Sequence, residues 1–212
     1  MATGDRRQYP KGIIRRRQIY DATLQLIDTY GAANVRLGKI AKKVGLTSAG
    51  ILHYYRSMDD LLMNVLQEYD RQDLDPGSES TWNLGKKLTE SVQDPGMLLD
   101  ATITLVRRRT STPGAVELYA YMLMKSADSG FPKRSYIMLR KQFRHQIIKV
   151  MIESMDVSGK LSSRISSDTL ATAFAALLDG VQIQWLNDRN LDIESTIRNA
   201  FQLVLPLSQE SR

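Results

Sequence analysis

Residues 36–61, RLGKIAKKVGLTSAGILHYYRSMDDL, decide how the N-terminal part of this chain folds. Leu37, Ile40 and Val44 recur at the spacing of one helix face. Gly45 then stands where a tight turn needs a positive φ, which glycine adopts without steric cost. A short helix followed by a glycine turn is typical of the first half of a helix-turn-helix, so the stretch predicts two small helices that cross.

The second of these helices carries the surface that could touch another molecule. Thr47 or Ser48 can cap its N-terminus, and Ile51 and Tyr55 would face the interior of the domain. In a helix-turn-helix the second helix lies in the major groove of DNA. The candidate readers of base edges are the residues that the spacing leaves facing outward, Ala49, Gly50, His53 and Tyr54.

Positive charge is concentrated around this motif. Residues 1–58 contain 11 Lys and Arg against three Asp, whereas the rest of the chain contains 18 basic and 20 acidic residues. This distribution favours phosphate binding, which releases the counterions of DNA, over a basic terminus that only aids solubility. Arg15, Arg16 and Arg17 lie near the start of the first helix, an unfavourable place for cations, and a nearby DNA backbone would relieve that cost.

The motif resembles the N-terminal domain of TetR-family transcriptional regulators. The positions that match the usual family pattern are Ile40-Ala41, Gly45, Thr47-Ser48, Gly50, Leu52-His53-Tyr54-Tyr55, Ser57 and Leu61-Leu62. The run from Leu177 to Trp185 is similar to a segment that many members carry in a dimerising helix. The resemblance implies an all-α fold, with an N-terminal three-helix DNA-binding domain before a larger helical domain for ligand binding and dimerisation.

Two residues depart from the family pattern. Arg36 stands where Thr or Ser usually caps the first motif helix, and Met58 stands where a phosphate-contacting Lys usually follows Ser. Arg36 itself and Arg56 could reach phosphates at these places. The predicted DNA-binding surface consists of Arg36, Lys39, Thr47, Ser48, Ala49, Gly50, His53, Tyr54 and Arg56.

The remainder of the chain also has helical patterns. A first helix is expected from about residue 14 to residue 30, and a helix after the motif should begin at Ser57, which can cap it. We expect a flexible basic arm at 1–12, a helix-turn-helix domain at 13–58 and a helical domain at 59–212. Later periodic segments predict helices at about 81–93, 95–110, 113–128, 132–155, 166–188 and 192–205.

The helix expected at 166–188 is apolar on two sides. One stripe contains large residues, and a second contains Ala173, Ala176 and Gly180, which would let another helix approach closely. The last helix offers further apolar residues, so we expect a four-helix homodimer interface across a two-fold axis, with a buried helix of a monomer as the alternative. The residues predicted at this interface are Phe174, Leu177, Gly180, Val181, Gln184, Ile197 and Phe201.

Aromatic and Met side chains are frequent in the middle of the chain. Flexible Met side chains suit a surface that repacks around apolar ligands. We therefore expect, as the family resemblance implies, a pocket for a small-molecule effector among the helices of residues 60–150, although such stripes can also be plain core. The candidate pocket residues are Trp82, Met97, Tyr119, Met122, Tyr136 and Phe143.

The resemblance also implies a mechanism. A homodimer would hold its two recognition helices about one duplex turn apart, roughly 34 Å, on a palindromic double-stranded DNA operator. A small, largely apolar effector would change this spacing and release the DNA, as in a repressor. A transcriptional activator of the same fold is the alternative, and a helical enzyme that converts a small molecule is a less favoured one.

Composition argues against several other classes of protein. The chain has no Cys, so we expect no disulfide, no thiolate metal site and no cysteine nucleophile; with only two His and no suitable carboxylate spacing, we expect no metal site. No Ser/His/Asp arrangement or phosphate-binding loop is indicated, so we also expect no catalytic residues and no cofactor. No stretch approaches the roughly 18 apolar residues that a membrane helix requires. The first ten residues contain no apolar signal core, so a cytoplasmic globular protein is expected.

Overall fold

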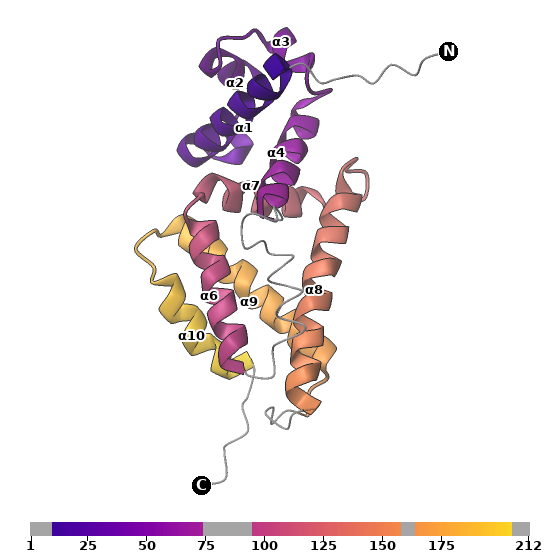
Figure 1. Cartoon of the computed structure of the whole chain (residues 1–212), viewed down its shortest axis with the longest axis vertical. Coiled ribbons are helices and arrows are strands. Elements are labelled where there is room, and N and C mark those ends of the chain that lie inside the picture. Colours follow the sequence, from indigo (N-terminus) through magenta and orange to yellow (C-terminus); the bar gives the residue numbers. More distant parts are fainter. Residues whose placement is uncertain (1–9, 74–94, 158–163, 205–212) are drawn as a thin grey trace, which may run out of the picture.

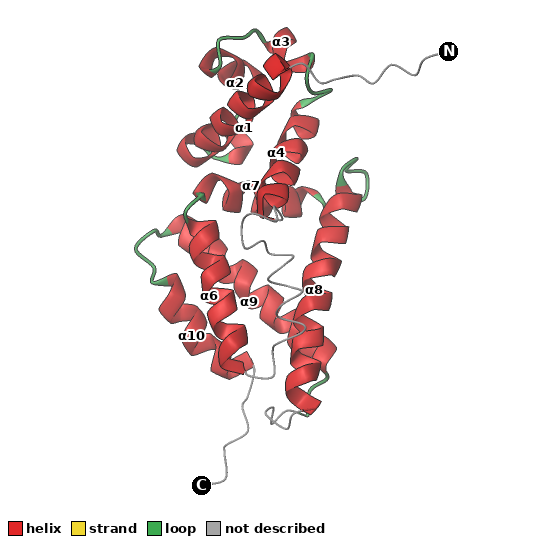
Figure 2. Ribbon diagram, viewed as in Figure 1, coloured by secondary structure: helices red, strands yellow, loops and turns green. Residues whose placement is uncertain are grey.

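The computed structural model describes residues 10–73, 95–157 and 164–204. This part of the chain contains helices and turns and no strand, which confirms the all-α prediction (Figure 2). α1, α2 and α3 form a head at one end, α7 lies across the middle, and α6, α8, α9 and α10 form a body at the other end (Figure 1). The elements are α1 (Pro10–Tyr30), the 3₁₀ helix η1 (Ala32–Asn34), α2 (Leu37–Lys43), α3 (Ser48–Leu52), α4 (Met58–Asp73), α6 (Pro95–Thr110), α7 (Pro113–Lys125), α8 (Arg134–Val157), α9 (Ser167–Asn187) and α10 (Ile193–Val204).

The helices after residue 95 begin and end within three residues of the predicted bounds. The helix predicted at 81–93 lies outside the described residues. α1 begins at Pro10 rather than near residue 14, so residues 10–12 are helical and are not part of the expected arm. Pro10 is the first residue of α1, and proline is readily accommodated in the first turn of a helix because the N–H that it lacks has no partner there.

α4 joins the head to the rest of the molecule through one hydrophobic core. Its buried residues Leu62 and Leu66 belong to the same cluster as Ile19 and Ile27 of α1. Leu118 of α7 completes this cluster from the side of the body. The boundary expected at residue 58 therefore coincides with the start of a helix that packs on both parts.

The head is docked closely on α7. Gly114, the second residue of α7, approaches α1 so closely that a Cβ atom there would lie 2.3 Å from the carbonyl oxygen of Leu24. One turn later, Glu117 Oε1 accepts a 2.6 Å hydrogen bond from the backbone N–H of Ala32. Only glycine permits this helix-to-helix distance, so the orientation of the head depends on Gly114.

A second hydrophobic core holds the body together. α6, α8, α9 and α10 contribute to it, and the rings of Phe174 and Phe201 meet edge to face with centroids 5.7 Å apart. Phe174 is only 1% exposed. This corrects the expectation for four residues assigned to the dimer interface, which are buried inside their own protomer: Phe174, Val181, Ile197 and Phe201.

The other side of α9 is uncovered in the protomer. Ala173, Ala176 and Gln184 are exposed, and Ile183 is 43% exposed. Gly180 lies along the same helix, and a Cβ atom built on it would meet nothing within 4 Å. The small-residue stripe of the sequence is therefore a surface of the protomer, whereas the stripe of large residues is core.

Candidate nucleic-acid interface

The turn between α2 and α3 has the predicted glycine geometry. Gly45 has a φ of 66°, in the left-handed region that favours glycine. The N–H of Leu46 then donates a 2.8 Å hydrogen bond to the carbonyl oxygen of Ala41, which closes the end of α2. Ile40 and Ala41 are buried, so one side of α2 packs against the rest of the head while its other side faces solvent.

α3 is a short helix with a defined cap and one buried face. Thr47 Oγ1 accepts a 3.0 Å hydrogen bond from the N–H of Gly50, so Thr47 rather than Ser48 is the N-cap. Ile51 and Tyr55 are buried, as the spacing predicts. The other predicted residues in this helix and next to its ends lie on the surface: Thr47, Ser48, Ala49 and His53 are exposed, and Gly50 and Tyr54 are half-buried.

Two arginines of α1 brace the helix-turn-helix from behind. Arg15 Nη1 donates a 3.0 Å hydrogen bond to the carbonyl oxygen of Val44, at the end of α2. Arg16 Nη1 donates to the carbonyl oxygen of Tyr54, and its guanidinium lies 5.4 Å from the centroid of the Tyr55 ring. The sequence indicated only that cations are unfavourable at this helix start. The carbonyl groups that accept from Arg15 and Arg16 lie 29 and 38 residues further along the chain, so no local pattern predicts these hydrogen bonds.

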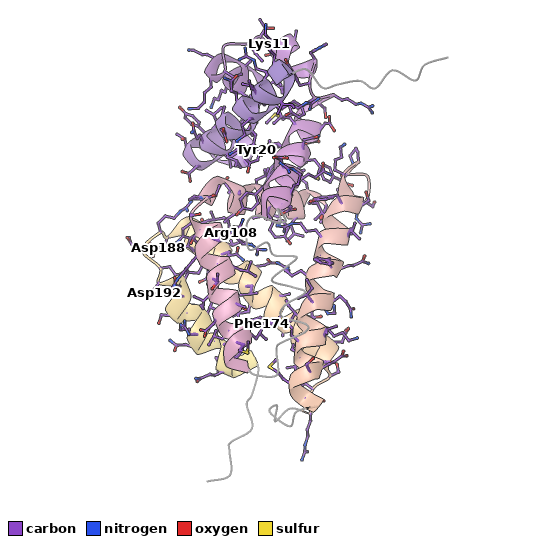
Figure 3. All side chains as sticks on the ribbon, viewed as in Figure 1. Lys11, Tyr20, Arg108, Phe174, Asp188 and Asp192 are labelled. Carbon is purple, nitrogen blue, oxygen red and sulfur yellow. The ribbon has the colours of Figure 1, made fainter. Side chains whose placement is uncertain are left out.

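The basic residues predicted to reach phosphates are exposed on the same head. Arg36 donates to the carbonyl oxygens of Ala33 and Val35 and occupies the N-cap of α2 without a side-chain cap bond. The ammonium group of Lys39 lies 4.2 Å from the centroid of the Tyr30 ring. Side chains of the head project outward around α2 and α3 in Figure 3. Long cationic side chains at such a surface can turn from these weak contacts to phosphate oxygens.

The start of α4 is tied to the body as well as capped. Ser57 Oγ accepts a 3.0 Å hydrogen bond from the N–H of Asp60, which confirms the predicted N-cap. The carboxylate of Asp60 accepts hydrogen bonds from Lys133 Nζ, at 2.7 Å, and from the N–H of Arg56, and these hold the pKa of Asp60 below its usual value. Met58, the departure from the family pattern, packs against the first core.

Further along α4, a second ion pair makes the same connection. Asp70 accepts two hydrogen bonds from the guanidinium of Arg140, at 2.8 and 2.9 Å, and a third from the hydroxyl of Tyr136 at 2.7 Å. The side chains of Asp70 and Arg140 are each 16% exposed. Burial raises the pKa of Tyr136, and the negative charge of Asp70 raises it further. α4 is therefore fastened to α8 by groups that are costly to separate.

The predicted pocket residues do not all come together. Tyr119 and Met122 are buried on α7, and Tyr136 packs against the same cluster. Met97 is 46% exposed and Phe143 is 39% exposed, so neither is enclosed. Trp82 lies outside the described residues.

A cavity that the sequence did not indicate lies between head and body. Its volume is about 440 Å³, and Tyr20 and Arg108, which border it, are labelled in Figure 3. Its walls come from α1, α4, the end of α6 and the turn between α6 and α7, so no continuous stretch of sequence contains the residues that form it. The lining residues are Arg17, Tyr20, Asp21, Leu24, Gln25, Tyr69, Arg108, Ser111 and Thr112.

The described residues contain neither a metal-binding cluster nor a membrane-spanning helix. Within residues 10–73, 95–157 and 164–204, no three His, Asp or Glu side chains gather where they could hold a metal ion. No helix in these ranges combines the length and the apolar character needed to cross a membrane.

The head matches a known family, and the whole chain has a known fold. Residues 19–65 match the model of the bacterial regulatory proteins, tetR family. Over 55 residues the chain is 40% identical to the HTH-type transcriptional regulator BetI 1 of Chromohalobacter salexigens, a match that covers 26% of this chain and 27% of that regulator. The chain thus spans less than a third of the length of this curated relative.

Two solved structures resemble nearly the whole chain. The MbdR regulator from Azoarcus sp. CIB superposes with a TM-score of 0.72 at 18% identity, covering 92% of this chain and 100% of that one. FadR of Thermus thermophilus, a TetR-family transcriptional repressor in complex with lauroyl-CoA, superposes with a TM-score of 0.59 at 18% identity, covering 92% and 97%. At these identities the similarity shows a shared fold.

Proposed function

We propose that the protein is a sequence-specific, DNA-binding transcriptional regulator of the tetR type that acts in the cytoplasm, a proposal supported by the match of residues 19–65 to the model of that family. The observation that carries the proposal is the exposed face of α3, capped by Thr47 and braced from behind by Arg15 and Arg16. α3 enters the major groove and reads base edges, while Arg36 and Lys39 position the head on phosphates.

The binding unit is a homodimer. One short recognition helix contacts few bases, and a two-fold axis supplies a second half-site about 34 Å away. The uncovered face of α9 supports this part of the proposal, since small side chains there leave room for a partner helix. The residues that offer this face are Ala173, Ala176, Gly180, Ile183 and Gln184.

Regulation acts through α4. This helix shares a core with the head and is fastened to the body by Asp60–Lys133 and Asp70–Arg140. A small, largely apolar effector bound in the body shifts α4 and with it the distance between the two recognition helices, which releases the operator. For nearly complete release the effector must prefer the non-binding form by about 5 kcal/mol.

A charge substitution on α3 tests the DNA-binding face. Ala49→Glu places a carboxylate on the exposed surface that we assign to the groove, where it would meet the phosphates of DNA. Like charges held together at an interface cost several kcal/mol, so operator affinity should fall at least tenfold, about 1.4 kcal/mol. Operator fragments are first selected from genomic DNA, and affinities are then measured by fluorescence anisotropy at several salt concentrations.

Ser195→Glu is the matched control. It makes the same change of charge at an exposed position in the first turn of α10, far along the chain from the head. It should leave operator affinity unchanged apart from a small, salt-dependent effect. Equal losses in the two variants, or selection of no common sequence, would contradict the assignment of α3 as the recognition helix.

A further inference from the structure

Two buried polar atoms beside α8 lack hydrogen-bond partners. They are the hydroxyl oxygen of Tyr119 on α7 and Nε of Arg144 on α8, neither of which has a partner in the described structure. Tyr119 is only 9% exposed, so solvent does not reach its hydroxyl. Most buried polar groups in folded proteins are paired, because an unpaired one forfeits its bonds to water. Such atoms mark a place where a bound molecule would supply the missing partner.

The two atoms belong to one cluster. The guanidinium of Arg140 lies 4.0 Å from the centroid of the Tyr119 ring, and that of Arg144 lies 5.8 Å from it. Arg140 is held by Asp70 of α4, and both terminal nitrogens of Arg144 donate to Asp179 of α9, each at 2.6 Å. The Nε–H of Arg144 is buried and has no acceptor in the described structure.

The chemistry of the cluster defines what it can bind. A guanidinium nitrogen can only donate, and the Tyr119 hydroxyl can donate as well, so a group that satisfies both must be an acceptor. The two guanidiniums are already neutralised by two carboxylates in paired contacts. An added carboxylate would be a buried charge in excess. An ammonium group could donate to the Tyr119 hydroxyl but would leave Nε of Arg144 without an acceptor, whereas an uncharged carbonyl oxygen can accept from either donor without adding a buried charge.

We propose that Tyr119 and Arg144 form the head-group site of the effector and bind an uncharged carbonyl oxygen, such as that of a ketone, ester or amide, on an otherwise apolar molecule. The inference rests on the proposed function and specifies the chemical class of its effector. The site also connects ligand binding to the head. The Tyr119 ring packs on Arg140, and Arg140 holds Asp70 of α4, so a ligand that shifts Tyr119 would also move α4, the helix that joins the head to the body.

Tyr119→Phe tests the site in the free protein first. The change removes the unpaired hydroxyl and keeps the ring, so it should raise the midpoint of thermal unfolding. Tyr121→Phe, on the same helix but less buried, is the matched control and should leave the midpoint unchanged. A lowered midpoint in Tyr119→Phe would mean that the hydroxyl is paired in the folded protein, and would overturn the proposal.

Binding is then measured with three probes of similar chain length: 2-undecanone, decanoate and decyltrimethylammonium. By calorimetry the ketone should bind most tightly to the unaltered protein, and Tyr119→Phe should weaken it at least fivefold, whereas Tyr121→Phe should not. Unchanged ketone affinity in Tyr119→Phe, tighter binding of a charged probe, or binding of none of the three would overturn the head-group assignment. Operator affinity is measured on the same proteins without ligand. The proposed function predicts that the unaltered protein and both variants bind DNA, so a loss of DNA binding would contradict the proposed function, whereas retained DNA binding with failed ligand binding would contradict only the head-group site.

Discussion

Gly114 is the position where a single added carbon should do most damage to the arrangement of head and body. In Gly114→Ala the new Cβ would lie 2.3 Å from the carbonyl oxygen of Leu24 and 3.3 Å from the backbone nitrogen of Asp28. Both atoms belong to the backbone of α1, so no side chain can rotate away and one helix must shift. Overpacking of this kind costs roughly 1–3 kcal/mol.

A smaller effect opposes this cost. Alanine is favoured over glycine by up to about 1 kcal/mol inside a helix, and less in the first turn, where Gly114 lies. The net loss should be about 1–2 kcal/mol of the free energy of unfolding. For a chain of this size that lowers the unfolding midpoint by about 2–8 °C, which calorimetry or circular dichroism resolves.

Gly12→Ala is the control for helix propensity. Gly12 also lies near the start of a long helix, but a Cβ atom there would meet nothing within 4 Å. This variant should be as stable as the unaltered protein or slightly more stable. If Gly114→Ala unfolded at the same temperature as Gly12→Ala, α1 and α7 would not be in the close contact described, and the argument that Gly114 sets the docking of the head would be refuted.

Two further predictions concern α9 and α4. Gly180→Arg should convert the proposed dimer to monomers in analytical ultracentrifugation with unchanged helical content, because the side chain has open space in the protomer but would fill the place of a partner helix; a dimer that persists would argue against this face. Asp70→Asn should lower the free energy of unfolding, measured by chemical denaturation, by about 3 kcal/mol, since it leaves the guanidinium of Arg140 buried without its counter-charge. Asp100→Asn is its control, because the pair of Asp100 is exposed and worth at most about 1 kcal/mol; equal losses would mean that the Asp70 pair is no more than a surface contact.

Sequence alone determined the elements and the character of the head. Helical periodicity predicted the helices after residue 95 to within three residues, and Gly45 predicted the left-handed turn. Ser57, and either Thr47 or Ser48, were expected to be caps because such residues accept from N–H groups two or three positions later, and the structure selects Thr47. These features depend on interactions within a few residues, which a sequence displays directly.

Tertiary structure alone decided which neighbour covers each face. Periodicity placed Phe174 and Phe201 on apolar helix faces but could not show that the two rings pack against each other inside one protomer. Two contacts likewise join residues far apart in the chain: the hydrogen bond from Arg16 to Tyr54 and the ion pair of Arg140 with Asp70. Only the structure shows that the hydroxyl of Tyr119 is buried without a partner. A helix pattern specifies the direction of a side chain around its own axis, whereas its partner depends on how whole helices cross, and that is set by close approaches such as the one at Gly114.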